Sequence, residues 1–396
     1  MEKVLSSTIS ESTNQRKVNH CVTILVVLCF IRIFLLELFL NDKINYLSVF
    51  LASVSAFVTF VAVIFVFDRI ERSVKILGAL LILAFAVSFL IHKSGFEYIC
   101  NTFTVLGLIA VLPYTNLKRK AITFFTVFFV AYGLILILLA PKFGEGNKEL
   151  INVITNTSSF VMFYLMCILF AFMRKSKNNV IPFIFAIIAL LCQFLFVGRS
   201  SLIGTAIFLI CLLFRRLFNK ASPKVVRNLQ IVLCVLAVAF AYFYAVILYE
   251  AAGYGSIVIF GKDIYTGRQI IWSAAFERIK GNLLFGIGNV LTAGNYVGIV
   301  NIHNQILGYL TCFGLIATVL IIVLIGLLTS RIYEQKQSNF GVALISAVII
   351  MSYFETTFYA SVHVVMFIVP LVIIYTLDRQ KQSKEVKIDN TLLLAR

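Results

Sequence analysis

Apolar residues occur along this chain in long unbroken runs, and short polar segments separate one run from the next. A helix needs about 20 apolar residues to cross the hydrocarbon core of a bilayer. The runs lack the alternation of apolar and polar residues that is typical of barrel strands, so helices are favoured. The pattern predicts an all-α membrane bundle of about twelve transmembrane helices. The predicted spans are 20–40, 46–67, 76–92, 98–113, 121–140, 153–173, 180–197, 200–214, 229–249, 304–328, 340–356 and 361–377.

The basic residues predict the orientation of these spans. With the N-terminus in the cytoplasm, cytoplasmic segments hold 24 of the 34 Lys and Arg residues, and external segments hold 9. The acidic residues divide evenly, so the asymmetry belongs to basic residues alone, as membrane insertion requires. Both termini are therefore expected in the cytoplasm, with polar tails at 1–19 and 378–396.

One external connection is much longer than the others. Nine predicted spans occupy 20–249 and three occupy 304–377, and between them lies a loop of 54 residues, 250–303. Long loops of this kind usually carry function or are disordered. Because this loop contains aromatic, Gly and charged residues without low-complexity repeats, we expect it to be ordered.

Composition excludes the soluble classes of protein. Hydrophobic residues make up 61% of the chain, charged residues 13%, and the mean hydropathy is +1.00, which leaves too little polar surface for a soluble domain. The net charge is +17, and the basic residues behind it are concentrated in the predicted cytoplasmic loops. We therefore expect no nucleic-acid partner. The eight cysteines lie in or beside apolar runs without metal-ligand spacing, which indicates packing residues.

The segment TGRQIIWSAAFERIKGN in the long loop predicts a short helix. Thr266 and Gln269 fit a capping box, and Trp272, Phe276 and Ile279 fall on one face. Arg268 would then lie in the first turn. The backbone N–H groups and the helix dipole there favour an anion such as a diphosphate. An interfacial helix whose Arg meets lipid headgroups is the alternative.

Polar residues also lie at the expected external ends of spans, and Arg199 and Glu355 are two of them. Arg199 is the sole charge between Val180 and Phe214 and is expected at a hairpin tip with Ser200; an ionisable residue there is a functional candidate, or it simply snorkels to the headgroups. Glu355 lies at another hairpin bend, where it could orient an arginine, accept a proton or merely meet water.

His303 and Asn304 lie where the long loop re-enters the membrane. A His at the water boundary can accept a proton, although helix capping by Asn301 or Asn304 explains the polar cluster equally well. Arg32 lies inside the first span with Glu37 and is expected to pair with another helix or to snorkel. His363 is expected to be a hydrogen-bonded core residue.

The order of these elements resembles the O-antigen and capsular polysaccharide polymerase and O-antigen ligase family. The matching segments are GRSSLIG at a hairpin tip, YTGRQIIWSAAFERIKGNLLFGIGN in the long loop and NIHNQILGYLTCFGLIATVLIIVLI at the loop exit. The family pattern has Ser/Gly-Arg-Ser, then Gly-Arg-x-x-x-Trp and Gly-x-Gly, then His-Asn with a later Gly. Many members have Ser-Arg where this chain has Gly198-Arg199.

The resemblance implies a GT-C-like membrane glycosyltransferase at the outer face of the bacterial cytoplasmic membrane. It implies an inverting, metal-independent transfer with no cofactor, in which an oligosaccharide leaves polyprenyl (undecaprenyl) diphosphate. Arg268 and Arg199 would stabilise the leaving diphosphate, which agrees with the lack of a tight external carboxylate pair. His303 is the expected base, with Glu355, Asp263 and Glu250 behind it.

Substrate contacts are expected at Trp272, Asn304, Ser200 and Asp263. A flippase and a chain-length regulator are the expected protein partners, and the lipid bilayer surrounds the chain. Joining of repeat units, as in capsule or O-antigen synthesis, is favoured over ligase-type transfer of a finished glycan because the chain is compact with a single sizeable loop. The alternative to an enzyme is a transporter, namely a flippase for the lipid-linked sugar. It would predict internal repeats and helices broken near the middle of the membrane.

Overall fold

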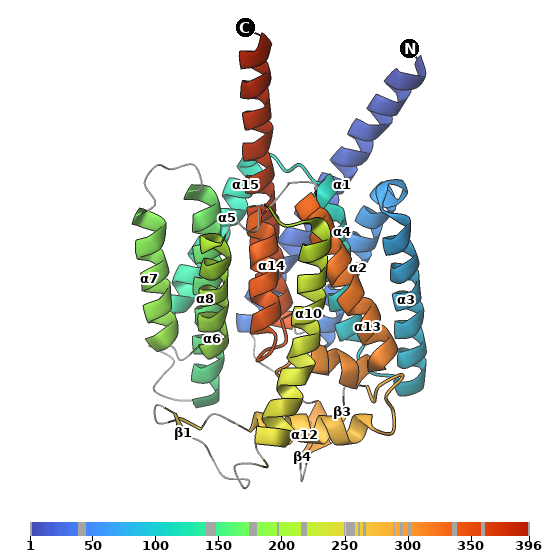
Figure 1. Ribbon diagram of the computed structural model, residues 1–396, viewed down its shortest axis with the longest axis vertical. Helices are drawn as coiled ribbons and strands as arrows, with labels where there is room; N and C mark the ends of the chain where they lie inside the picture. The colour runs from blue at the N-terminus through green and yellow to red at the C-terminus, as the bar shows by residue number, and fades with distance from the viewer. Residues whose placement is uncertain are drawn as a thin grey trace.

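The structure is a computed structural model of the 396-residue chain. It describes residues 2–38, 45–139, 148–173, 180–195, 198–214, 220–248, 250, 258–259, 262–263, 267–288, 290–293, 296–299, 302–334, 339–357 and 361–394. Long helices running up and down form a bundle, and a smaller layer of short elements lies at one end of it (Figure 1).

Helices lie at each of the twelve segments for which spans are predicted. They are α1 (Glu2–Leu38), α2 (Asn45–Val66), α3 (Arg72–His92), α4 (Phe96–Val111), α5 (Arg119–Leu139), α6 (Lys148–Met173), α7 (Val180–Leu195), α8 (Arg199–Leu213), α10 (Pro223–Tyr242), α13 (Gln305–Glu334), α14 (Asn339–Met351) and α15 (Ser361–Leu394). Short helical turns extend three of them: η2 (Phe67–Arg69) after α2, η3 (Leu112–Tyr114) after α4 and the π-helical η5 (Phe243–Leu248) after α10.

Seven helices of the described chain are long and apolar enough to cross a membrane, namely those at 46–69, 72–92, 96–114, 119–136, 223–248, 305–334 and 363–380. Four others are apolar but shorter. Many large apolar side chains on the outer faces of the bundle are exposed, among them Phe57, Leu90 and Leu138. A soluble protein would bury them, whereas a bilayer favours them there. The chain is therefore a multi-pass membrane protein, and a total of twelve crossings stays a prediction.

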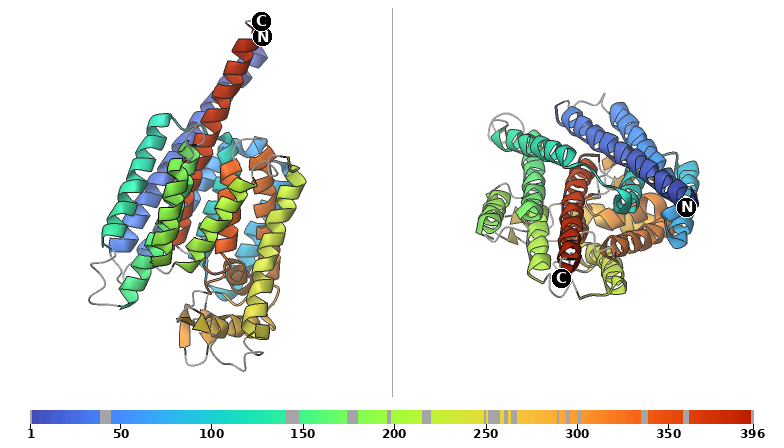
Figure 2. Two further views of the ribbon diagram at one scale, coloured as in Figure 1. Left: turned by 60° about the vertical axis from the view of Figure 1, so that its left-hand side comes forward. Right: turned by 90° about the horizontal axis from the view of Figure 1, so that it is seen from above.

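Both chain ends leave the bundle at the same end (Figures 1 and 2). The polar tails predicted at 1–19 and 378–396 continue α1 and α15 without a break in the helix, as far as Glu2 and Leu394. The termini therefore lie on one side, as the even number of predicted spans requires. The side of the membrane to which they belong stays a prediction.

The long loop lies at the opposite end of the bundle (Figure 1). Its central element is the predicted helix, α12 (Arg268–Ile279). Two antiparallel hairpins flank it: β1 (Val258–Ile259) with β2 (Lys262–Asp263), and β3 (Val290–Ala293) with β4 (Tyr296–Ile299). Sequence patterning predicted the helix and not the strands, because these strands are too short to show alternation.

The predicted span 304–328 is wrong in one respect, because α13 is not continuous. Gly314 has φ 79° and ψ −178°, which breaks the helix after Phe313. The part after the break, 315–334, has 20 residues and by itself is long enough to cross the hydrocarbon. The part before the break, 305–313, is therefore a separate short helix at the end of the bundle that carries the long loop, and it is buried.

The break in α13 is filled by the segment that follows α12. The N–H of Ile287 donates to the carbonyl of Thr311 at 2.7 Å, and the N–H of Leu315 donates to the carbonyl of Leu283 at 2.8 Å. A Cβ on Gly286 would lie 2.6 Å from the Thr311 oxygen. The Gly-x-Gly of the loop therefore allows backbone to approach backbone, and it satisfies the carbonyls that the break leaves free.

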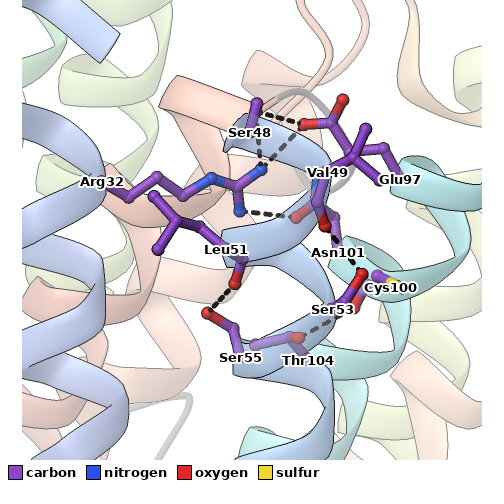
Figure 3. Close-up of polar contacts among 10 residues, drawn as sticks. All are labelled: Arg32, Ser48, Val49, Leu51, Ser53, Ser55, Glu97, Cys100, Asn101 and Thr104. Carbon is purple, nitrogen blue, oxygen red and sulfur yellow. Dashed lines mark hydrogen bonds and ion pairs between the residues drawn. The ribbon is translucent and has the colours of Figure 1, made fainter. Parts of the chain in front are cut away.

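The buried polar residue of the first span, Arg32, pairs with other helices, as predicted. Its guanidinium donates to Glu97 at 2.8 Å and to Asn101 at 2.7 Å, both on α4, and to Ser48 of α2 at 3.4 Å (Figure 3). Arg32 is 2% exposed. The placement of the Glu37 side chain lies outside what the structure describes. All eight cysteines are free and six are buried, which confirms their prediction as packing residues.

Candidate functional site

Glu355 lies at the centre of a charged cluster at the end of the bundle that carries the long loop. The span predicted at 340–356 is too long, because α14 ends at Met351 and Glu355 lies in the turn before α15. Its Oε1 accepts from Nη2 of Arg268 at 3.2 Å, and its Oε2 lies 3.1 Å from Nδ1 of His303. One carboxylate thus joins the helix of the long loop to the residue at the loop exit, and Glu355 itself is only 8% exposed.

The cluster favours the ionised form of Glu355. Burial by itself would raise the pKa of this carboxyl. The hydrogen bond with His303 and the positive charges of His303, His363 and Arg268 outweigh burial, and the net pKa is lowered. Glu355 therefore acts as an acceptor for both partners and is not a proton donor at neutral pH. A carboxylate of this kind orients its partners and stabilises positive charge on them.

Arg268 begins α12, as the sequence predicted. The N-cap is Gly267, which has no side chain to cap the helix, and not the Thr266 of the predicted capping box. Gln269 is buried, and its Oε1 has no hydrogen-bond partner within the described part of the chain. The placement of Thr266 lies outside the described residues. Among the side chains that the structure describes, none caps the first-turn N–H groups beside Arg268, which leaves this helix end suited to an anion.

Trp272 is completely buried, which makes substrate contact the wrong role for it. Its ring packs against Phe240 and Tyr244, with centroid separations of 6.3 and 5.3 Å. Its indole N–H donates to the carbonyl oxygen of Ile302 at 2.5 Å. Trp272 is therefore a positioning residue, since it holds the backbone immediately before His303.

The predicted apolar face of α12 is confirmed. Ile279 is buried and Phe276 half-buried on the same side as Trp272. Ser273 also donates to the carbonyl of Ala245 at 3.0 Å, which fastens α12 to the π-helical turn η5. The helix that carries Arg268 is thus anchored along its length, so that the guanidinium projects from a rigid element.

His303 adopts a backbone conformation that is uncommon for any residue other than glycine. Its φ is 50°, in the left-handed region, and such a residue persists where the surroundings hold it. The hydrogen bond of Trp272 to Ile302 on one side and the cap of α13 on the other supply this restraint. His303 is half-buried, and its side chain is 36% exposed, so its ring is held by protein and remains accessible to a ligand.

Asn304 has a structural role, which was one of the alternatives open from the sequence. Its Oδ1 accepts from the N–H of Leu307 at 2.9 Å and so caps α13. Its Nδ2 donates to the carbonyls of Ala237 at 3.0 Å and Tyr353 at 3.1 Å. Asn304 is completely buried, so its amide ties α13, α10 and the Glu355 turn together and is not free for a substrate.

Arg199 lies at the same end of the bundle as the charged cluster. It begins α8, and it is exposed. Gly204 of α8 packs closely against Met351 of α14. A Cβ on Gly204 would lie 2.2 Å from the Met351 sulfur. Arg199 is five residues before Gly204, or about 7.5 Å along the helix, and Glu355 is four residues after Met351. Within the described chain Arg199 makes no hydrogen bond or ion pair with the cluster, so its convergence with Arg268 and His303 stays a prediction.

The structure gives fewer contacts for the other three residues of the predicted site. Ser200 is buried at the start of α8, and Glu250 is exposed. Asp263 lies in β2 opposite Val258, and its side chain lies outside what the structure describes. The roles predicted for these three residues stay predictions.

His363 is the residue of this region that sequence analysis undervalued. It packs against Phe160 with ring centroids 4.7 Å apart, and its charge acts on Glu355. The hydrogen bond expected for this histidine is not made at Nδ1, which is buried and has no partner within the described chain. The spacing of eight residues from Glu355 across a turn gave no signal that the two side chains interact.

Comparison with protein-family models, with curated proteins and with solved structures gives no match to this chain. No group of three or more metal-ligating His, Cys, Asp or Glu side chains occurs among the described residues, and metal independence of the reaction stays a prediction.

Proposed function

We propose that this protein is a membrane glycosyltransferase that joins polyprenyl-diphosphate-linked oligosaccharide repeat units into a polysaccharide. The observation that carries the proposal is the bridge from Arg268 through Glu355 to His303. It brings a cation suited to a diphosphate and a base suited to a sugar hydroxyl to one carboxylate. The loop and helix elements that carry the two residues are the segments that resemble the polymerase and ligase family.

His303 is the proposed base. With the proton of its ring on Nδ1 and donated to Glu355, Nε2 is left as an acceptor. Nε2 takes the proton of the acceptor hydroxyl as the hydroxyl oxygen bonds to the anomeric carbon. The anionic Glu355 then stabilises the imidazolium that results.

Arg268 is the proposed cradle for the leaving group. As the new bond forms, the bond from the anomeric carbon to the diphosphate oxygen breaks, and the electron pair leaves with the polyprenyl diphosphate. The guanidinium of Arg268 carries five N–H donors, and it contacts Glu355 through Nη2. The remaining N–H donors of Arg268, with the backbone N–H groups at the start of α12, are already in place to stabilise the charge as it develops. Arg199 is the proposed second cation for the same group.

Under this proposal the reaction takes place at the outer face of the bacterial cytoplasmic membrane. The cluster lies at the end of the bundle opposite the chain termini, and the distribution of basic residues predicts that the termini are cytoplasmic. Ligase-type transfer of a finished glycan uses the same chemistry with another acceptor.

A flippase for the lipid-linked glycan is the second candidate, and the break of α13 at Gly314 is the observation in its favour. Broken helices near the middle of the membrane form the binding sites of many transporters. This break adjoins the long loop, however, and 20 residues of helix remain beyond it. It therefore favours a transporter less than a break at mid-membrane would.

The test compares variants in a strain that lacks the chromosomal copy. Arg268→Ala and Arg199→Ala should each abolish polymer while the protein stays in the membrane and single lipid-linked repeat units accumulate. Arg278→Ala is the matched control, because Arg278 is exposed on the same helix as Arg268. Long chains made by both variants would contradict the proposed diphosphate cradle.

The same strain distinguishes the three functions. Single repeat units exposed on the outer face, after deletion, indicate a polymerase. Full-length chains that remain on the lipid indicate a ligase, and repeat units that remain facing the cytoplasm indicate a flippase. His303→Ala should lower turnover by 100-fold or more while donor binding is retained, as expected for loss of a general base.

A further inference from the structure

An apolar groove lies between α2 and α3, away from the charged cluster. Its main part has a volume of about 560 Å³, and a second part of about 430 Å³ continues it, with Phe60, Ile82, Phe85 and Phe103 lining both. α2 packs mainly against α1 and α4, and α3 packs mainly against α13. The two helices are thus held apart, with α4 as the floor of the space between them.

The groove is long and opens on the outer surface of the bundle. The residues of α3 that line it run from Val74 to Phe89, which is about 22 Å at the rise of an α-helix. Exposed side chains on α2 form its edge, among them Phe60, which is 47% exposed, and Ile64, which is 52% exposed. A groove that is apolar along this length and open to the hydrocarbon suits a fatty-acyl chain that enters sideways from the bilayer.

Only one end of the groove carries charge. Asp68 and Lys75 are part of the lining of the main groove, and the other lining residues are apolar. The Lys75 ammonium lies 4.6 Å from the centroid of the Phe67 ring, which holds it at the entrance. Neither Asp68 nor Lys75 forms an ion pair with another described residue. The anion and the cation lie where the chain passes from α2 to α3. This connection is at the end of the bundle from which the chain termini leave (Figure 1).

We infer that this groove binds a phosphatidylethanolamine molecule, with one acyl chain between α2 and α3 and the headgroup at Asp68 and Lys75. The phosphate of this lipid would meet the Lys75 ammonium, and its own ammonium would meet the Asp68 carboxylate. Charge complementarity favours this occupant over phosphatidylglycerol and phosphatidylcholine. Phosphatidylglycerol offers hydroxyls but no cation to Asp68, and the quaternary ammonium of phosphatidylcholine has no N–H to donate.

The inference does not depend on the proposed glycosyltransferase activity. The full chain is purified in detergent, stripped of lipid, and mixed with dioleoyl phosphatidylethanolamine, phosphatidylglycerol or phosphatidylcholine for native mass spectrometry. We expect phosphatidylethanolamine to bind at least fivefold more strongly than the other two. Asp68→Asn should remove this preference, and Lys75→Gln should weaken the binding of all three lipids.

Gly78 offers a direct way to fill the groove. It lines the main part, and a Cβ there would meet nothing within 4 Å, so a larger side chain enters open space. Gly78→Trp should abolish lipid retention, and Gly78→Leu should reduce it severalfold if the tryptophan variant does not fold. Leu83→Trp is the matched control, because Leu83 is 60% exposed on the same helix and does not line the groove.

Two results would overturn the inference. One is equal retention of phosphatidylethanolamine by the parent chain and by a folded Gly78→Trp or Gly78→Leu variant. The other is a change in oligomeric mass on filling the groove without any change in bound lipid, which would assign the groove to a second copy of the chain. Monomeric protein that retains phosphatidylethanolamine only while Gly78 is unchanged supports it.

Discussion

The indole N–H of Trp272 donates to the carbonyl oxygen of Ile302, the residue directly before His303. Through this bond the packing of α12 against η5 sets the position of the proposed base. Trp272 lies in the Gly-Arg-x-x-x-Trp segment, four residues after Arg268. The same helix therefore supplies the proposed cation and positions the proposed base on another segment.

Trp272→Phe tests this relationship. Phenylalanine keeps an aromatic ring in the site but removes the hydrogen bond, so the Ile302 carbonyl loses its partner at a cost of about 1–3 kcal/mol. We expect polymer synthesis to fall about tenfold while the protein stays folded in the membrane. Phe276→Leu on the same helix is the control, because Phe276 is half-buried and packs without a polar contact in the described structure. Equal activity of the two variants would show that the hydrogen bond does not position His303.

Glu355 predicts a specific loss of stability in acid. Its pKa is lowered in the folded protein, so the stabilisation is complete above the pKa of the unfolded chain and is lost as pH falls through the folded pKa. The Tm of the parent chain in detergent should therefore fall between about pH 5 and pH 3. Glu355→Gln cannot ionise and should show a smaller fall over the same range. Identical profiles would contradict the ionised bridge.

Gly314 and Gly286 should tolerate no side chain. A Cβ on Gly314 would lie 2.3 Å from the carbonyl oxygen of Leu284, and its φ is in the left-handed region. Gly314→Ala must therefore displace backbone on both segments, and we expect it to lower the Tm by several degrees and to expose the long loop to protease. Gly281→Ala is the control, because a Cβ there meets nothing within 4 Å. Protease resistance unchanged by Gly314→Ala would show that the loop is held by other contacts.

The sequence predicted local elements well, because each depends on a local pattern. Apolar runs located the helices, and the periodicity of Trp272, Phe276 and Ile279 located the buried face of α12. The break of α13 escaped prediction, since an isolated Gly in an apolar run is common and only the approach of Leu284 and Gly286 explains it. The capping box places the start of α12 one residue too early, because the N-cap is Gly267.

The site was predicted as a set of residue types and not as an arrangement. The sequence indicates His303 and Glu355 by their place at expected membrane boundaries and Arg268 by its place in the first turn of the predicted loop helix. Orientation of an arginine is one of the roles that it leaves open for Glu355. The contact of Glu355 with His303 depends on how α14 and the loop exit meet, and no periodicity encodes that. Substrate contact is the role expected of Trp272 and Asn304 from their place beside the predicted site residues. In the structure both are buried, and their hydrogen bonds hold the backbone around His303.

The ion pair of Arg32 and Glu97 predicts unequal effects of removing its two members. Arg32 is almost completely buried, whereas the side chain of Glu97 is 22% exposed and lies in the first turn of α4, where the helix dipole favours an anion. Glu97→Gln leaves a buried cation without its counter-charge, so it should cost about 3–5 kcal/mol. Arg32→Met leaves an anion that water and the helix end can stabilise, so it should cost less.

The double variant completes this test, because residues in one buried network are not independent. Once Arg32→Met is present, Glu97→Gln no longer strands a buried cation, and the neutral amide can still accept from Ser48, whose Oγ lies 2.7 Å from Oε1 of Glu97 in the parent (Figure 3). The double variant should therefore be more stable than Glu97→Gln alone, as measured by Tm in detergent. If the Tm losses of the two single variants simply add in the double variant, the guanidinium and the carboxylate are stabilised separately. Their interaction would then contribute nothing to stability.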